Sequence, residues 1–167
     1  YDRAGIPFIN YLPVSEHMTD GHPYLFNITY TAESEAAYIA NYLRNIKGIE
    51  TATIISGQDE YGQALARQFR NTFSGLGGKI TIEKEVSPSP SNQTLEEIVS
   101  TIISANPETE NPGTIFIAAD DAISAQLVEL MKRKGVLYPI AGASNLSTEV
   151  FQGEINDQQE EEALPGY

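Results

Sequence analysis

The sequence predicts an α/β fold with a doubly wound parallel sheet, and three observations support this class. Short apolar segments alternate with segments of helical periodicity, as in successive βαβ units. Several helical segments end at a glycine. The apolar segments are nearly continuous, which is typical of parallel strands buried on both faces. The 167 residues, 41% of them hydrophobic, provide enough apolar material for the core of one domain.

The first half of the chain predicts three strands and two helices. Strands are expected at residues 6–10 and 24–28, with a loop at 11–23 that carries two prolines and both histidines. A helix starts at Thr31, because Thr31 and Ser34 are good N-caps and apolar residues recur at helical spacing after them; it ends at Gly48. The β-branched run 51–56 is the third strand. A loop at 57–62 leads to a helix at 64–73, which stops at Gly75.

The second half repeats the same order of elements. A strand is expected at 79–86, and the Ser- and Pro-rich segment 87–92 is a loop. Thr94 is expected to cap a helix at 95–104, which carries two glutamates near its positive end. The most hydrophobic strand is 114–119. The helix 122–134 has three basic residues in its last turn and ends at Gly135, and residues 139–142 form the last strand.

Composition and charge exclude several classes of function. Acidic residues outnumber Lys and Arg by 23 to 10, so a nucleic-acid backbone would be repelled and no nucleic-acid partner is expected. No apolar run approaches the roughly 20 residues of a membrane-spanning helix. The absence of cysteine excludes disulfides and thiolate chemistry. Five of the negative charges fall in the polar segment 152–162, which is expected to be a solvated tail.

Polar and aromatic residues follow the predicted strands at the places where a ligand would bind. Ligands of open parallel sheets bind outside the carboxyl ends of the strands. The candidates at these ends are Tyr30, Thr31, Gln58, Asp59, Glu60, Tyr61, Asp120, Asp121, Ser144 and Asn145. We expect one of the two adjacent aspartates, Asp120 or Asp121, to cap the next helix and the other to be free to face a ligand.

Other patterns are better explained by structure than by chemistry. Glu16, His17, Asp20 and His22 match no standard metal-ligand spacing and are expected in a solvated loop. The glycines at 75–78 follow a helix, so they end it and do not form a phosphate loop. No nucleophile elbow is present, and no cofactor or metal is expected. The sequence therefore favours a binding module over an enzyme.

Several segments resemble the type I periplasmic binding proteins, in particular the receptors of branched-chain amino-acid and amide ABC transporters. The similarity runs from about residue 4 to residue 151, and its most specific part is the string from Asp59 to Ala66. The other segments that carry it are 24–29, 53–55, 76–80, 105–107, 114–119, 134–136 and 140–142.

The resemblance implies two α/β lobes that close on a ligand, of which this chain covers a part. Residues 1–23 would be the end of the first lobe and the crossover, 24–151 the second lobe, and 152–167 an acidic tail or return segment. The chain starts without Met at an apolar segment, so we expect it to be part of a longer protein. An isolated lobe would expose its former interface, through which a dimer could form.

The resemblance also implies positions for a ligand. Tyr61 matches a tyrosine that lines the cleft, and Tyr11 and Ser15 lie near the segment that binds a ligand carboxylate. Ala32 and Ser144 stand where amino-acid-binding members have an aspartate and a glutamate, a departure that Thr31, Glu33 or Asp121 could compensate. The expected ligand-binding residues are Tyr61, Thr31, Asp120, Asp121, Ser144, Asn145, Tyr11 and Ser15.

The leading hypothesis is an extracytoplasmic solute-binding domain, periplasmic or extracellular, that hands a small polar, neutral or cationic ligand to the membrane permease of an ABC transporter. The alternative is the sensory ectodomain of a membrane signalling receptor, which a transmembrane helix after Tyr167 would distinguish. An enzyme is the third hypothesis, and turnover of a candidate ligand would support it.

Overall fold

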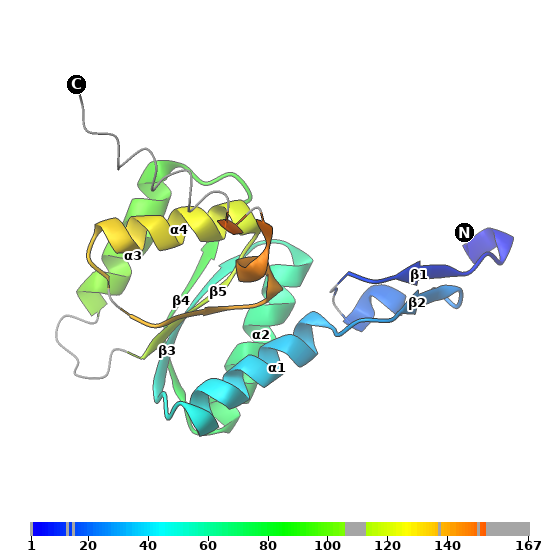
Figure 1. Cartoon of the computed structure of the whole chain (residues 1–167), viewed down its shortest axis with the longest axis horizontal. Helices are drawn as coiled ribbons and strands as arrows, with labels where there is room; N and C mark the ends of the chain where they lie inside the picture. Colours follow the sequence, from blue (N-terminus) through cyan, green and yellow to red (C-terminus); the bar gives the residue numbers. More distant parts are fainter. Residues whose placement is uncertain are drawn as a thin grey trace.

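A computed structural model describes residues 2–12, 14, 16–105, 113–136, 138–149 and 151–152. The main body is a parallel sheet of four strands in the order β4-β3-β5-β6 (Figure 1). The strands are β3 (Thr51–Gly57), β4 (Lys79–Val86), β5 (Thr114–Ala118) and β6 (Ile140–Gly142). The main helices are α1 (Ala32–Asn41), α2 (Glu60–Gly75), α3 (Asn92–Ala105) and α4 (Asp121–Arg133).

Two separate hydrophobic cores cover the two faces of this sheet. Residues of α1 and α2 pack on one face, where Phe69 stacks on Phe116 of β5 with ring centroids 4.0 Å apart. Residues of α3 and α4 pack on the other face, around Ile55 and Ile117. All five residues of β5 are buried, which explains why this strand has no polar face in the sequence. The predicted doubly wound α/β fold is therefore confirmed (Figure 1).

The helix ends follow the local signals in the sequence. Thr31 caps α1, as predicted, and Asp120 is the member of the aspartate pair that caps α4. Gly48 and Gly135 have positive φ angles of 68° and 72°, the left-handed conformation in which glycine ends a helix at low cost. A short π-helical segment, η3 (Tyr42–Ile46), extends α1 toward Gly48.

Two predicted helix starts are wrong. Helix α2 begins at Glu60 instead of residue 64, because Asp59 caps it by accepting the main-chain N–H of Gly62. Gly62 is not a loop residue: a side chain there would place Cβ 2.6 Å from the carbonyl oxygen of Ala118, so glycine allows α2 to approach β5. Helix α3 begins at Asn92, and Ser91, not Thr94, accepts the first main-chain N–H.

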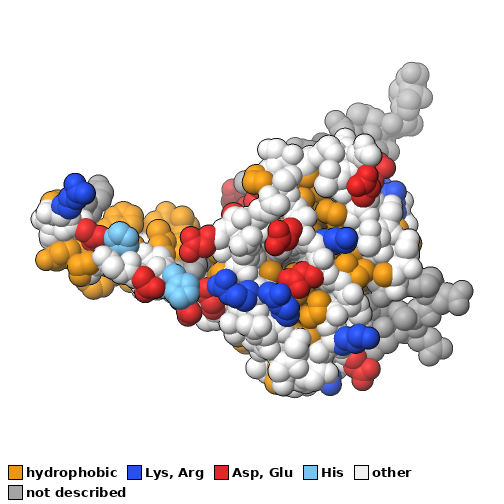
Figure 2. Space-filling model, turned by 180° about the vertical axis from the view of Figure 1, so that it is seen from behind, with side chains coloured by type: hydrophobic (Ala, Val, Ile, Leu, Met, Phe, Trp, Pro, Cys, Tyr) orange, Lys and Arg blue, Asp and Glu red, His pale blue; other side chains and the backbone are white. Residues whose placement is uncertain are grey.

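The N-terminal part forms an arm that projects from the body (Figure 1). In the arm, β1 (Phe8–Asn10) pairs in parallel with β2 (Leu25–Asn27), with the 3₁₀ turns η1 (Asp2–Ala4) and η2 (Glu16–Thr19) beside them. The strand predicted at 24–28 thus pairs outside the four-stranded sheet. The arm exposes large apolar side chains, visible in orange in Figure 2, among them Ile9 (59%) and Ile28 (70%). These side chains lack cover from the described part of the chain.

The arm is attached to the body at the start of α1. The main-chain N–H of Ala32 donates to the carbonyl of Val14, and the N–H of Glu16 donates to the carboxylate of Glu33 (3.0 Å). The guanidinium of Arg67 in α2 lies 3.8 Å from the same carboxylate. These contacts connect the loop of the arm to both helices on one face of the sheet.

Candidate functional site

The carboxyl ends of β3, β5 and β6 bring three segments to one edge of the sheet, and the hydrogen bonds of Glu35 hold a fourth segment, from α1, at the same edge. These are the first turns of α1, α2 and α4 and the 3₁₀ turn η4 (Ser144–Ser147) that follows β6. We call this the carboxyl edge, made of residues 29–36, 57–63, 119–124 and 143–149. Thr31, Tyr61, Asp120, Asp121, Ser144 and Asn145 all belong to it. The strand-end rule accounts for all of them except Thr31, which follows β2 of the arm.

Three residues from distant parts of the sequence form a hydrogen-bonded cluster at this edge. The Tyr61 hydroxyl donates to Oε2 of Glu35 (3.0 Å), and the main-chain N–H of Ser144 donates to Oε1 of the same carboxylate (2.6 Å). The Ser144 hydroxyl lies 3.2 Å from the Tyr61 oxygen. Glu35 therefore connects α1 to both the start of α2 and the turn η4.

The Tyr61 hydroxyl keeps its proton in this cluster. Burial raises its pKa well above the usual value of 10, and the nearby negative charge of Glu35 acts in the same direction. The hydroxyl therefore donates to Glu35, and this hydrogen bond holds the Tyr61 ring at the carboxyl edge. A fixed aromatic ring at the edge of a sheet is a suitable wall for a small ligand.

Thr31 and Asp120 have structural partners. The Thr31 hydroxyl accepts the main-chain N–H of Ser34 (3.2 Å), and the Ser34 hydroxyl accepts the N–H of Thr31, which completes a capping box. Asp120 Oδ1 accepts the main-chain N–H of Ile123 (2.8 Å), so Asp120 is the capping member of the aspartate pair. Asp120 is also exposed, which leaves its other oxygen open to solvent.

Asp121 and Asn145 hold η4 against the start of α4. The Thr148 hydroxyl donates to Asp121 Oδ2 (2.7 Å). The Asn145 side chain, only 6% exposed, donates through Nδ2 to the carbonyl of Ala119 (2.8 Å) and to the Ser124 hydroxyl (3.0 Å). Asn145 Oδ1 is buried and has no hydrogen-bond partner among the described residues.

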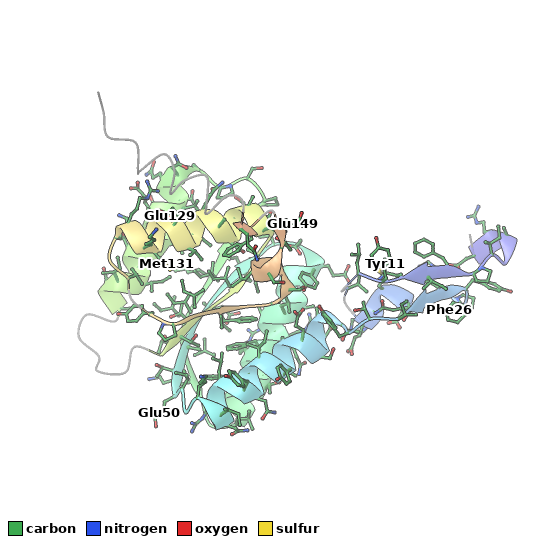
Figure 3. The ribbon with its side chains drawn as sticks, viewed as in Figure 1. Tyr11, Phe26, Glu50, Glu129, Met131 and Glu149 are labelled. Carbon is green, nitrogen blue, oxygen red and sulfur yellow. The ribbon has the colours of Figure 1, made fainter. Side chains whose placement is uncertain are left out.

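The predicted site residue Tyr11 does not belong to the carboxyl edge. Tyr11 lies on the arm, where its side chain is 72% exposed (Figure 3). Ser15 lies outside the described residues. Glu35, in contrast, is a member of the cluster that the sequence does not indicate, because the helix dipole alone accounts for an acidic residue in the first turn of a helix.

The two histidines of the arm have separate partners. His17 Nδ1 lies 3.0 Å from Asp20 Oδ2, and His22 pairs with Asp2. The Asp20 hydrogen bond and the neighbouring carboxylates raise the pKa of His17 above 6.5. Within the described ranges, no three His, Asp or Glu side chains are grouped closely enough to hold a metal ion. In the same ranges, no helix is long and apolar enough to cross a membrane.

The chain has a doubly wound α/β fold, a class in which ligands bind at the carboxyl edge of the sheet, and it carries a hydrogen-bonded polar cluster at that edge. The sequence model of the periplasmic binding protein family matches residues 1–151, and the chain belongs to this family. The family consists of binding proteins. A search of curated proteins finds no significant match.

Solved structures of solute-binding proteins share the fold. The branched-chain amino acid transporter substrate-binding protein LivJ from Streptococcus pneumoniae, in complex with isoleucine, is 18% identical over 92% of this chain, with a TM-score of 0.77. An ABC transporter substrate-binding protein from Desulfitobacterium hafniense, in complex with Leu, is 23% identical over 85% of the chain, with a TM-score of 0.70. The solute-binding protein from Rhodopseudomonas palustris BisB5, in complex with 3,4-dihydroxybenzoic acid, is 14% identical over 87%, with a TM-score of 0.69.

The chain corresponds to only part of each of these proteins. It covers 41% of the first two structures and 39% of the third.

Proposed function

We propose that this chain is part of an extracytoplasmic solute-binding protein that delivers an amino acid or a related small polar solute to the membrane permease of an ABC transporter. The observation that carries the proposal is the Glu35–Tyr61–Ser144 cluster at the carboxyl edge of a sheet, in a chain of the periplasmic binding protein family. The cluster fixes an aromatic wall and leaves carboxylate and hydroxyl oxygens beside it, which are the groups that bind small polar solutes.

The ligand would be enclosed by closure of two lobes about a hinge. In this proposal residues 24–151 form the second lobe, residues 1–23 belong to the end of the first lobe and the crossover, and residues 152–167 lead back toward the first lobe. The exposed apolar side chains of the arm support this assignment, since such a surface in a folded protein normally packs against another structural unit.

The ligand of this chain would make other polar contacts than the ligands of the similar solved structures. The neighbours carry isoleucine, Leu and an aromatic acid, so the fold accepts varied solutes. This chain has Ala32 and Ser144 where the resemblance implies two carboxylates, and Glu35 supplies a carboxylate at the same edge.

Calorimetric titration of the full-length gene product tests the proposal. The panel contains isoleucine, leucine, pentanamide, 1,5-diaminopentane and 3,4-dihydroxybenzoate. We expect at least one of these probes to bind, and Tyr61→Ala to weaken that binding because the ring is lost. Tyr38→Ala is the matched control, since Tyr38 is 72% exposed on α1. A folded protein that binds none of the probes would contradict the proposal.

A further inference from the structure

The carboxyl edge carries charge of one sign only. Its four segments contain seven acidic residues and no Lys, Arg or His. The acidic residues are Glu33, Glu35, Asp59, Glu60, Asp120, Asp121 and Glu149. Arg67, the cation that pairs with Glu33, comes from the second turn of α2, beyond these segments. A ligand that enters here therefore meets a negative potential, which attracts cations and repels anions.

Unused hydrogen-bond acceptors remain at this edge. A carboxylate offers about four acceptor positions. The cluster uses one on each oxygen of Glu35, through the Tyr61 hydroxyl and the Ser144 N–H, so a further position on each oxygen remains. A second acceptor in these segments is Asn145 Oδ1. Asn145 is only 6% exposed, and its Oδ1 has no hydrogen-bond partner among the described residues. These acceptors require a ligand that donates hydrogen bonds.

Aromatic rings favour an organic cation over a metal ion. Tyr61 and Tyr30 belong to this edge. The Tyr30 side chain is 51% exposed, and it contributes to the raised pKa of Tyr61. The face of an aromatic ring attracts an ammonium or guanidinium group. Calcium needs about six to eight oxygen ligands, whereas the cluster offers one carboxylate and two hydroxyl groups.

We propose that the solute site described above binds a small organic cation, with the Glu35 carboxylate as its counter-ion and the Tyr61 ring beside it. This inference rests on the proposed solute-binding function and specifies its ligand class. The cation donates to the unused acceptor positions of Glu35, while Tyr61 and Ser144 keep that carboxylate in place. The ligand has no carboxylate on the side that faces this lobe, since nothing basic at the carboxyl edge would receive it.

Four probes of similar size and different charge test this inference in the full-length gene product. They are 1,5-diaminopentane, isoleucine, pentanamide and pentanoate, each titrated by calorimetry. We expect the diamine to bind most tightly and pentanoate not to bind. The Kd of the diamine should rise with added NaCl, because salt screens the attraction between the amine and the acidic edge. This salt dependence needs no variant.

The role of Glu35 is tested by Glu35→Gln, which keeps the shape of the side chain and removes its charge. We expect this variant to raise the Kd of the diamine about 30-fold, the size associated with losing one partner of a hydrogen-bonded charge pair. Glu35→Asp, which keeps the charge, should retain more of the binding and covers the case in which the amide variant does not fold. Glu50→Gln is the control, since Glu50 is exposed and precedes β3, at the opposite edge of the sheet (Figure 3).

The outcomes separate the two proposals. If isoleucine or pentanamide binds and the diamine does not, the cation inference is wrong and the solute-binding function stands. If the diamine binds equally well to wild type and Glu35→Gln, the assignment of Glu35 is overturned. If the folded protein binds none of the probes, the solute-binding proposal fails together with the inference.

Discussion

Replacing Tyr61 with phenylalanine removes one hydroxyl group and keeps the ring that the cluster orients. The Tyr61 hydroxyl donates to Glu35 Oε2 at 3.0 Å and lies 3.2 Å from the Ser144 hydroxyl. A hydrogen bond to a charged group contributes about 1.5–3 kcal/mol to stability. Glu35 keeps its second donor, the Ser144 N–H at 2.6 Å, and Tyr61 is only partly buried, so the lower part of that range applies.

We therefore expect Tyr61→Phe to lower the free energy of unfolding by about 1.5–2 kcal/mol, measured by urea denaturation with an unchanged m-value. Tyr38→Phe is the control: its exposed hydroxyl should change stability by less than about 0.5 kcal/mol. Combining Tyr61→Phe with Glu35→Gln should cost less than the sum of the single losses, because both remove the same contact. Equal, negligible effects of Tyr61→Phe and Tyr38→Phe would refute the cluster.

The stability difference between wild type and Tyr61→Phe should also depend on pH. The pKa of Tyr61 is near 10 in the unfolded chain and higher in the folded protein. The folded state therefore keeps a proton that the unfolded state loses, so stability from this group is complete below pH 10 and is lost as pH rises toward the folded pKa. The difference in unfolding free energy between wild type and Tyr61→Phe should shrink above pH 10. A difference that stays constant from pH 8 to pH 11 would contradict the raised pKa.

Three further predictions concern the core, a helix cap and the arm. Phe116→Ala should lower the free energy of unfolding by about 3–5 kcal/mol in urea denaturation, because it removes a fully buried ring stacked on Phe69; a loss below about 1 kcal/mol would exclude the stack. Thr31→Ala should cost about 1 kcal/mol by the same measurement, and Thr31→Ser much less, since serine also caps; equal losses would exclude the capping role. The NMR titration of His17 should have its midpoint above pH 6.5, and Asp20→Asn should lower it; an unchanged midpoint would show that Asp20 is not the cause.

The elements that local sequence signals define could be predicted. Residues 79–86 form a strand with the expected bounds, and Thr31, Gly48, Asp120 and Gly135 mark helix ends as expected. The predicted start of α2, residue 64, is four residues too late because a glycine such as Gly62 can belong to a loop or to a helix. It is typical of a loop, but here it makes room for the carbonyl of Ala118 in a neighbouring strand.

The site could be predicted only as far as the strand-end rule extends. That rule identifies Tyr61 and Ser144 as edge residues, but no local pattern indicates that Glu35 bonds to both, since they are 26 and 109 residues away in the sequence. The pairing of β2 with β1 could not be predicted from the sequence either, because contacts between residues distant along the chain determine which parallel strands pair. Contacts of this kind are a property of the fold.

Amide chemical-shift mapping of the full-length gene product, during titration with the probe that binds most tightly, tests the binding site most directly. We expect the amide signals of Glu35, Tyr61 and Ser144 to shift together with one apparent Kd. The signals of Glu50 and Gly135, which lie at the other end of the strands and helices, should stay unchanged. Ligand-dependent shifts at Glu50 and Gly135, with none at the carboxyl edge, would contradict a binding site at this edge.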